Sequence, residues 1–167
     1  MKPPVPARDA ALERDALRLL KVRERCRKEL ERRLKQKGHA NERIEDLLNI
    51  YEARGWINDE RFATFFVRDR IRLRPKSYRM IDRELSARGV ALEIRQRVLS
   101  EFQAEFPEEE MARSQALRRW RSLSGDLKSR RVSLIRWLRT KGYPLSLARR
   151  LAGEMAEVET PADGGFD

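Results

Sequence analysis

The chain has 167 residues, of which 40% are hydrophobic and 39% charged, and 38 Lys and Arg against 27 Asp and Glu leave a net charge of +11. A balance this basic indicates a polyanionic partner such as nucleic acid, because binding releases the counterions condensed on phosphates. One Cys and one His exclude an internal disulfide and a Cys/His metal cluster, and no apolar run is long enough to span a membrane.

Residues 1–8 hold three prolines and no apolar periodicity, so we expect a disordered lead. Residues 9–54 follow with apolar residues at helical spacing, which predicts a first three-helix repeat. Many charged residues there stand four apart and can pair on a solvated face. The positions expected in its helices are Leu12, Leu19 and Leu20, then Cys26, Leu30 and Leu34, and then a third helix from about Asn41, a fair N-cap.

Residues 55–102 carry the clearest helix start and stop signals. Asn58 is a plausible N-cap, since its side-chain oxygen can accept from an amide of the first turn, and Pro75 ends that helix. A second helix follows, and Gly89 closes it with the left-handed conformation common at helix ends. A third helix is expected over about residues 91–102, so this stretch predicts a second three-helix repeat.

Residues 103–156 comprise an acidic connector and a third three-helix repeat. Pro107 and the three glutamates after it are typical of a helix start. Trp120 falls in an apolar column and is expected in the core, whereas the column of Trp137 is polar. Packing against the neighbouring repeat, stacking on a base and contact with a protein partner all stay open for Trp137. Residues 157–167 predict an acidic disordered tail that either solubilises the chain or competes with nucleic acid.

Three glycines bring the repeats into register. Gly38 and Gly89 lie 51 residues apart, and Gly89 and Gly142 lie 53 apart. Any amphipathic helix pair ending in glycine would align in part, but here four apolar columns agree without a gap. We therefore predict an all-α fold of three tandem three-helix repeats in an elongated, curved array. The columns are Leu30, Ile81 and Leu134; Leu34, Leu85 and Leu138; Leu47, Val98 and Leu151; and Tyr51, Phe102 and Met155.

The central repeat also carries a family resemblance. Its segments GWINDERFA, a run of arginines and RMIDRELSARGV are similar to the central signature of the RecX family of recombination regulators. The likeness extends over residues 9–156, although family members often have a glycine where residues 74–77 read Arg-Pro-Lys-Ser. The signature residues, which we assign to holding the repeat together, are Trp56, Asp59, Arg61, Phe62, Phe66, Ile81, Leu85 and Gly89.

Two basic clusters are the candidate contact sites. Six cations within residues 68–79 repel one another unless an anion spreads between them, so we favour binding over a solvated helix end. Residues 112–153 carry twelve cations and one acid, and phosphate contact is a physical reason for tolerating such a field. The candidate DNA-binding or filament-binding residues are Arg68, Arg70, Arg72, Arg74, Lys76 and Arg79, and then Arg118, Arg119, Arg121, Lys128, Arg130, Arg131, Arg136, Arg139 and Lys141.

No catalytic motif stands out in the sequence. The glycines are scattered outside any GxxxxGK segment, and the single His and Cys offer no nucleophile and base pair. We therefore predict a binding protein and not an enzyme, with no cofactor, no metal and no small-molecule substrate. Because the N-terminus lacks an apolar signal region, we expect a cytoplasmic monomer with no membrane association.

The RecX resemblance implies a partner and an activity. The partner would be the RecA recombinase filament on single-stranded DNA. The activity would be inhibition or modulation of filament extension, ATP hydrolysis, recombination and the SOS response. The residues alone support a modular, nonenzymatic binder of polyanions. An alternative is a sequence-specific duplex-DNA regulator of helix-turn-helix type, and a third possibility is a protein adaptor whose basic face meets an acidic partner.

Overall fold

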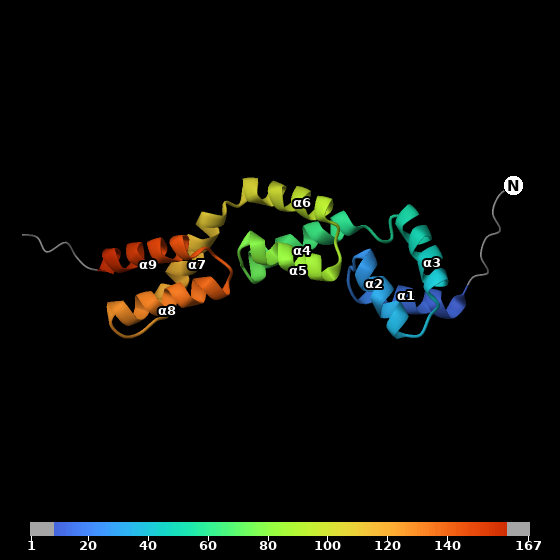
Figure 1. Cartoon of the computed structure of the whole chain (residues 1–167), viewed down its shortest axis with the longest axis horizontal. Coiled ribbons are helices and arrows are strands. Elements are labelled where there is room, and N and C mark those ends of the chain that lie inside the picture. Colours follow the sequence, from blue (N-terminus) through green and yellow to red (C-terminus); the bar gives the residue numbers. More distant parts are fainter. Residues whose placement is uncertain (1–8, 160–167) are drawn as a thin grey trace, which may run out of the picture. The chain divides into compact units, whose positions relative to one another are not determined.

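The computed structural model describes residues 9–159, and every regular element in that range is an α-helix (Figure 1). None of these helices combines the length and apolarity needed to cross a bilayer. The predicted all-α fold with three successive sets of three helices is confirmed. The helices are α1 (Ala10–Val22), α2 (Arg27–Gln36), α3 (Asn41–Ala53), α4 (Asp59–Leu73), α5 (Tyr78–Arg88), α6 (Leu92–Glu105), α7 (Glu108–Arg121), α8 (Leu127–Thr140) and α9 (Leu145–Glu159).

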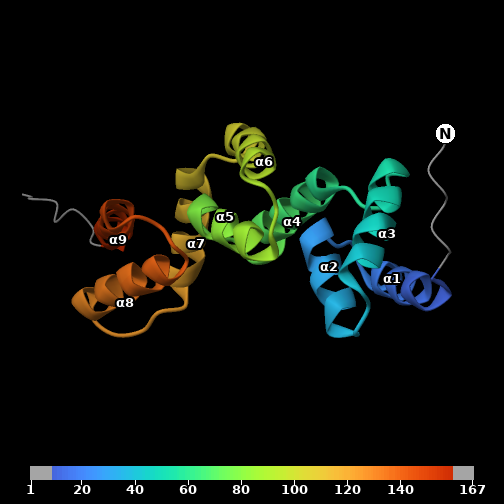
Figure 2. The ribbon, with the colours of Figure 1, turned by 45° about the vertical axis from the view of Figure 1, so that its right-hand side comes forward.

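The chain folds as two compact units that share the middle helices. Unit 1 comprises residues up to Phe66 together with Glu84–Val98, and unit 2 comprises Val67–Arg83 together with residues from Leu99 onward. Each of α4, α5 and α6 therefore contributes one part to each unit. Within unit 1, α1, α2 and α3 form a bundle, and within unit 2, α7, α8 and α9 form another (Figure 2). The finer repeat boundaries set from the sequence stay a prediction.

Of the two N-caps that the sequence indicates, one is confirmed and one is wrong. The Asn58 side chain accepts from the Arg61 N–H at 2.8 Å, as predicted for the start of α4. The prediction that Asn41 is an N-cap is wrong, because the extended backbone of Ala40 already holds that position. The carbonyl of Ala40 accepts from the N–H of Ile44, so α3 begins with Asn41 as its first helical residue.

Two helices extend past their predicted ends. The third central helix was expected to stop near residue 102, but α6 continues to Glu105 and takes in the start of the predicted connector. Helix α9 continues to Glu159, so the predicted tail begins as helix and not as disordered chain. Residues 1–8 and 160–167, where the lead and the rest of the tail are predicted, lie outside the described range.

The predicted register of apolar columns is confirmed by burial. All twelve residues of the four aligned columns are buried, including the fully buried Leu30, Ile81 and Leu134 of the first column. Apolar area removed from water contributes roughly 25 cal/mol per Å² to folding, so these positions supply the cores. In unit 1 the α1–α3 bundle closes around Leu34 and Ile44. In unit 2 the α7–α9 bundle closes around its own cluster, which includes the predicted core residue Trp120.

A carboxylate from a later helix completes the start of an earlier one in each unit. In unit 1 Asp59, the first residue of α4, accepts from the backbone N–H of Arg27 at 2.7 Å, where α2 begins. In unit 2 Glu108, the first residue of α7, accepts from the backbone N–H of Tyr78 at 2.7 Å, where α5 begins. Arg27 and Tyr78 share one column of the repeat alignment. The same contact therefore joins successive helix sets twice, using N–H groups that a helix start leaves without intrahelical partners.

The end of an earlier connector also bonds to the end of a later helix. In unit 1 the Cys26 thiol donates to the carbonyl of Arg88 at 3.2 Å. In unit 2 the N–H of Ser77 donates to the carbonyl of Lys141 at 2.9 Å. Both pairs occupy matching columns of the alignment, so each junction uses the same two chain positions.

Glycine is required where these junctions close. A Cβ on Gly89 would lie 2.4 Å from Cγ of Lys28, and a Cβ on Gly142 would lie 2.2 Å from Cγ of Met80. At Gly38, the aligned glycine of the first set, no atom of the described residues lies within 4 Å of such a Cβ. Its φ of +88° nevertheless matches the +90° of Gly142. Substitutions at Gly38 and Gly142 therefore distinguish the cost of a left-handed backbone from the cost of close atomic contact.

We predict that Gly142→Ala destabilises the protein more than Gly38→Ala. Both variants place alanine at a left-handed φ, which costs about 1–2 kcal/mol. Only Gly142→Ala also forces atoms together, and such overpacking adds about 1–3 kcal/mol. Urea unfolding of both variants measures the difference. Equal losses would show that close approach at Gly142 contributes nothing.

We also predict that Glu108→Ala lowers stability by about 0.5–2 kcal/mol, the usual cost of losing a helix cap. Glu110→Ala is the matched control, since Glu110 is an exposed acid in the same first turn of α7 and the cap on Tyr78 stays intact. Both variants lose the same favourable interaction with the helix dipole. Thermal melting compares them, and a control as unstable as Glu108→Ala would refute the cap.

Candidate nucleic-acid interface

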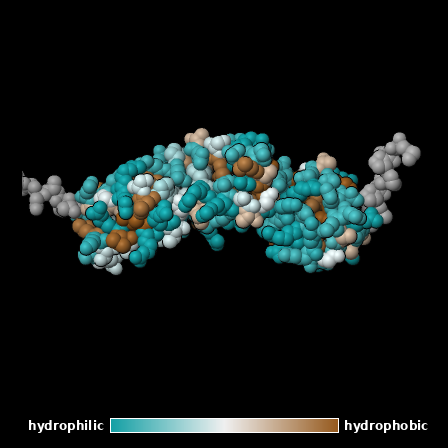
Figure 3. All heavy atoms as spheres, in the orientation of Figure 1, coloured by the Kyte–Doolittle hydropathy of each residue, from teal (hydrophilic) through white to brown (hydrophobic). Residues whose placement is uncertain are grey.

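The α7–α9 bundle presents a set of unpaired cations. Their side chains are exposed, and none forms an ion pair with any residue in the range 9–159. Figure 3 shows that hydrophilic residues cover most of the face it draws. Unpaired guanidinium and ammonium groups are available to phosphate oxygens. These cations are Arg118, Arg121, Lys128, Arg131, Arg136 and Arg149.

Arg130, a predicted contact residue, is held by partners within the α7–α9 bundle. Its side chain is only 14% exposed, and its guanidinium carbon lies 4.2 Å from the centroid of the Trp120 ring. The guanidinium pairs with Glu159 at 2.9 Å and donates to the carbonyl of Trp120 at 3.3 Å. The hydrogen bond from Arg130 lowers the pKa of Glu159 below its ordinary value. Arg130 therefore joins α8 to α7 and α9. Its exposed neighbour Arg131 becomes the candidate contact instead.

Three further predicted contact residues have partners within the bundle. Arg119 donates to the Ser122 hydroxyl at 3.5 Å, and Arg139 donates to the carbonyl of Tyr143 at 3.1 Å. The ammonium of Lys141 lies 5.2 Å from the centroid of the Trp137 ring. The Trp137 ring itself packs against the core of the α7–α9 bundle. Among the roles left open for Trp137, this geometry favours packing, within its own helix set.

An ion-pair network occupies two more cations of this bundle. Arg150 pairs with Glu109 at 2.7 Å and Arg113 pairs with the same carboxylate at 3.3 Å. Both arginines also pair with Glu154. The hydrogen bond from Arg150 is the main cause that lowers the pKa of Glu109 to about 2. These pairs join α7 to α9, so we assign Arg113 and Arg150 to stabilising the bundle.

The predicted central run, residues 68–79, divides into three kinds of position. Arg68 and Arg72 line a pocket of unit 2. Arg74 and Arg79 are exposed and form no ion pair with any residue between 9 and 159. The remaining two residues, Arg70 and Lys76, interact with other groups of the chain.

The pocket beside Arg68 and Arg72 combines aromatic and charged groups. Its volume is about 270 Å³, and the C-terminal halves of α4 and α6 line it. The rings of Phe102 and Phe106 stack with centroids 6.3 Å apart and an angle of 21° between their planes. Sequence reasoning missed this site, although two phenylalanines one helical turn apart, just before a proline, were a usable signal. The lining residues are Arg68, Ile71, Arg72, Phe102, Glu105 and Phe106.

A buried hydroxyl bonds to the backbone of two residues that line this pocket. The Tyr78 hydroxyl lies 2.9 Å from the carbonyl oxygen of Phe102 and 2.9 Å from that of Phe106. Burial raises the pKa of Tyr78 to about 12, so the hydroxyl keeps its proton at neutral pH and can donate to these carbonyls. Tyr78 thereby holds the last turn of α6 and the residue after it in place.

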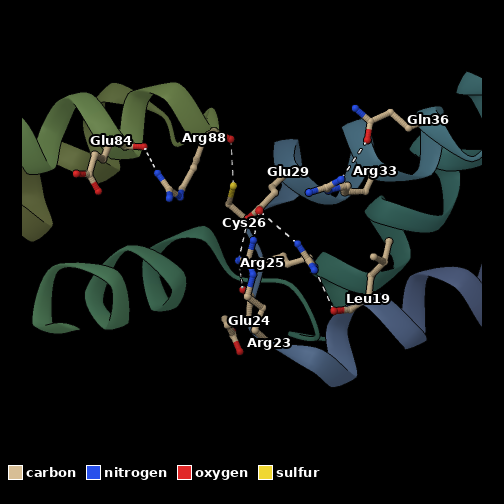
Figure 4. A network of polar contacts seen from close by, with 10 residues as sticks. All are labelled: Leu19, Arg23, Glu24, Arg25, Cys26, Glu29, Arg33, Gln36, Glu84 and Arg88. Atoms are coloured by element: carbon tan, nitrogen blue, oxygen red, sulfur yellow. Dashed lines mark hydrogen bonds and ion pairs between the residues drawn. The ribbon is translucent and has the colours of Figure 1, made fainter. Parts of the chain in front are cut away.

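The first helix set uses its charges for structure. Arg25 and Glu29 are 8% and 4% exposed, and they pair at 3.3 Å while Arg25 also donates to the carbonyl of Leu19 (Figure 4). A buried charge is tolerated only when paired and hydrogen-bonded. On the surface, Glu31 pairs with both Lys28 and Lys35. The predicted surface pairing is present, whereas the buried pair was missed because a sequence does not show burial.

The eight signature residues of the central stretch range from buried to exposed. Phe62, Ile81 and Leu85 are buried. Arg61 donates to the carbonyl of Gly55 at 3.0 Å and so braces the loop before α4. Trp56 is 46% exposed, and Gly89 is exposed as well.

The Trp56 ring contacts two neighbours in unit 1. It lies 4.9 Å from the Tyr51 ring, and the Arg54 guanidinium lies 5.5 Å from its centroid. Phe66 is partly buried, and the guanidinium carbon of Arg88 lies 4.4 Å from the centroid of its ring.

Among residues 9–159, no three His, Cys, Asp or Glu side chains come together as a metal site.

Comparison with known proteins bears on this arrangement. A family model for the first three-helix domain of RecX matches residues 14–49, and one for the second three-helix domain matches residues 58–99. The chain is 37% identical over 153 residues to the regulatory protein RecX of Corynebacterium efficiens, covering 87% of this chain and 71% of that protein. It is 30% identical over 140 residues to the regulatory protein RecX of Prosthecochloris aestuarii, covering 84% of this chain and 90% of that protein.

A solved structure gives the same answer for the fold. The crystal structure of RecX from Lactobacillus salivarius superposes with a TM-score of 0.73, at 22% sequence identity, over 87% of this chain and 95% of that chain. The two alignments cover most of each relative's length, and both relatives are named regulatory proteins. The chain therefore belongs to the RecX family of regulatory proteins.

Proposed function

We propose that this protein binds the RecA recombinase filament on single-stranded DNA and restrains its extension, ATP hydrolysis and recombination and SOS activities. Membership of the RecX family supports a regulatory role. The observation that carries the nucleic-acid part is the set of six exposed, unpaired cations on the α7–α9 bundle. A cation that is paired with an acid must exchange that partner for a phosphate, whereas an unpaired cation binds the phosphate directly and displaces the counterions condensed on the nucleic acid.

The position of two of these cations strengthens the proposal. Lys128 and Arg131 lie in the first five residues of α8, and no acid occupies its first turn. Cations at a helix start are disfavoured by the dipole, typically by about 0.3–1 kcal/mol each. The same dipole and the exposed N–H groups attract a phosphate to that end. A bound DNA strand would turn an unfavourable arrangement into a favourable one.

Contact with the strand suggests how restraint would work. A recombinase filament grows when further subunits bind the phosphates of the same strand. A regulator that neutralises those phosphates competes for them and slows extension. The predicted contact residues Arg68, Arg72, Arg74 and Arg79 would add to the cations of the α7–α9 bundle.

We predict that substoichiometric amounts of this protein lower ATP hydrolysis by a preformed RecA filament on single-stranded DNA. The rate should fall well before one regulator is present per recombinase, because the filament itself is the target. A fall that occurs only when the protein is abundant enough to coat bare DNA would reject filament binding. Strong competition by one duplex sequence would favour a duplex-DNA regulator instead.

We predict that the double variant Lys128→Glu with Arg131→Glu weakens single-stranded DNA binding and its salt dependence. Losing two phosphate contacts should flatten the slope of log affinity against log salt by about 1.4, at about 0.7 per contact. The helix should stay folded, because acids suit the start of α8. Fluorescence anisotropy at several salt concentrations measures the slope.

The matched control is Arg14→Glu with Arg18→Glu on α1. These two exposed arginines form no ion pair with any residue of the described range. Both double variants lower the net charge from +11 to +7. The control should keep most of the wild-type slope. Equal flattening in the two variants would mean that net charge, and not the α8 site, drives binding.

A further inference from the structure

The pocket between α4 and α6 holds opposite charges that do not pair with each other. Arg68 and Arg72 line one side and Glu105 lines another, yet none of the three forms an ion pair with a residue in the range 9–159. In the same unit, Arg150 and Glu109 on neighbouring helices do lie at ion-pair distance. A ligand with both acceptor and donor groups would satisfy all three.

The apolar part of the lining narrows the class of ligand. Ile71, Phe102 and the partly buried Phe106 supply apolar and aromatic surface in the same pocket as the charges. A volume of about 270 Å³ lies just below the roughly 300–1,000 Å³ of pockets for drug-sized ligands. A flat, aromatic group that carries an anion on one side and hydrogen-bond donors on the other fits this chemistry. A nucleotide has these properties.

We propose that this pocket takes one nucleotide of a single-stranded nucleic acid, an inference that rests on the proposed function and assigns it a base-binding site. The base lies against Phe106, since aromatic side chains provide sequence-tolerant stacking for unpaired bases. Arg68 and Arg72 hold the adjoining phosphate, as guanidinium groups match phosphate oxygens in a two-pronged geometry. The strand continues past the exposed Arg74 and Arg79 of the same run.

Glu105 gives the pocket a base preference. A carboxylate accepts hydrogen bonds from the exocyclic amino group of cytosine, whereas thymine offers a carbonyl oxygen at the same place. Oligonucleotides of cytidine therefore bind more tightly than those of thymidine. Glu105→Gln narrows that ratio, because the amide can donate to thymine as well.

Tyr78 and Pro107 position the stacking ring. The Tyr78 hydroxyl bonds to the carbonyls of Phe102 and Phe106, and Pro107 starts the turn into α7 directly after the ring. The backbone beneath Phe106 is thus fixed before a base arrives. A fixed platform avoids the entropy cost of ordering a loop on binding.

The test compares two oligonucleotides that carry the same number of phosphates, one with cytosine bases and one entirely abasic. Wild-type protein binds the cytosine oligonucleotide more tightly than the abasic one. Phe106→Ala loses roughly fivefold to a hundredfold in affinity for the cytosine oligonucleotide, the range of one stacking contact. The same variant binds the abasic oligonucleotide as wild type does, with an unchanged salt slope.

Phe65→Ala is the matched control. Phe65 is a 48% exposed phenylalanine on α4 that does not line the pocket. This variant loses the same ring and keeps wild-type affinity for both oligonucleotides. Circular dichroism confirms that both variants fold. A Phe106→Leu variant, which keeps apolar volume without a π face, shows the loss as well if stacking is the cause.

The outcomes separate this inference from the function on which it rests. Equal wild-type affinity for the two oligonucleotides overturns the base pocket but leaves phosphate-driven filament binding intact. Failure to bind either oligonucleotide, together with no effect on the filament, overturns both. If Phe106→Ala binds both oligonucleotides normally yet no longer slows the filament ATPase, the pocket holds a protein segment and the nucleotide proposal is wrong.

Discussion

The hydrogen bond that a carboxylate of one helix set accepts from the first backbone N–H of an earlier helix is the contact on which the rest of the arrangement depends. Asp59 completes α2 and Glu108 completes α5, each at 2.7 Å. Each three-helix set is too small to bury all of its apolar surface alone. Joining the sets through backbone amides makes the junction directional. In both junctions the carboxylate that reaches the open N–H group comes from the first residue of the following helix set.

The α7–α9 set differs from the others at the matching position. The column that holds Arg27 and Tyr78 reaches Arg131 in α8, where no carboxylate from residues 9–159 caps the helix at that position. Helix α8 instead begins earlier, at Leu127, and Asp126 caps it through the N–H of Ser129 at 2.7 Å. The departure leaves the cationic start of α8 exposed, and that is where the proposed phosphate contacts lie.

Charge count alone overstates the candidate interface. Of the basic residues in the α7–α9 bundle, Arg130 is covered by Trp120 and Glu159, and Arg113 and Arg150 are paired with acids. The partners that join different helices lie far away in sequence, 41 residues apart for Arg150 and Glu109, whereas Glu109 with Arg113 and Arg150 with Glu154 stand four apart. Helix periodicity reports neighbours only three or four residues away, so the pairs between helices had no signal in the chain. The exposed, unpaired cations were identified only once the helices were packed.

The sequence by itself determined the helix sets, their register and their main start signals, because apolar periodicity, caps and glycines act over a few residues. All twelve aligned apolar positions are buried, and Asn58 caps α4 as predicted. Only the tertiary structure decided which cations are committed, why Gly142 has no room for a side chain, and that Phe106 and Glu105 share a pocket with Arg68. Those features depend on contacts between distant segments, and such contacts exist only after the cores form.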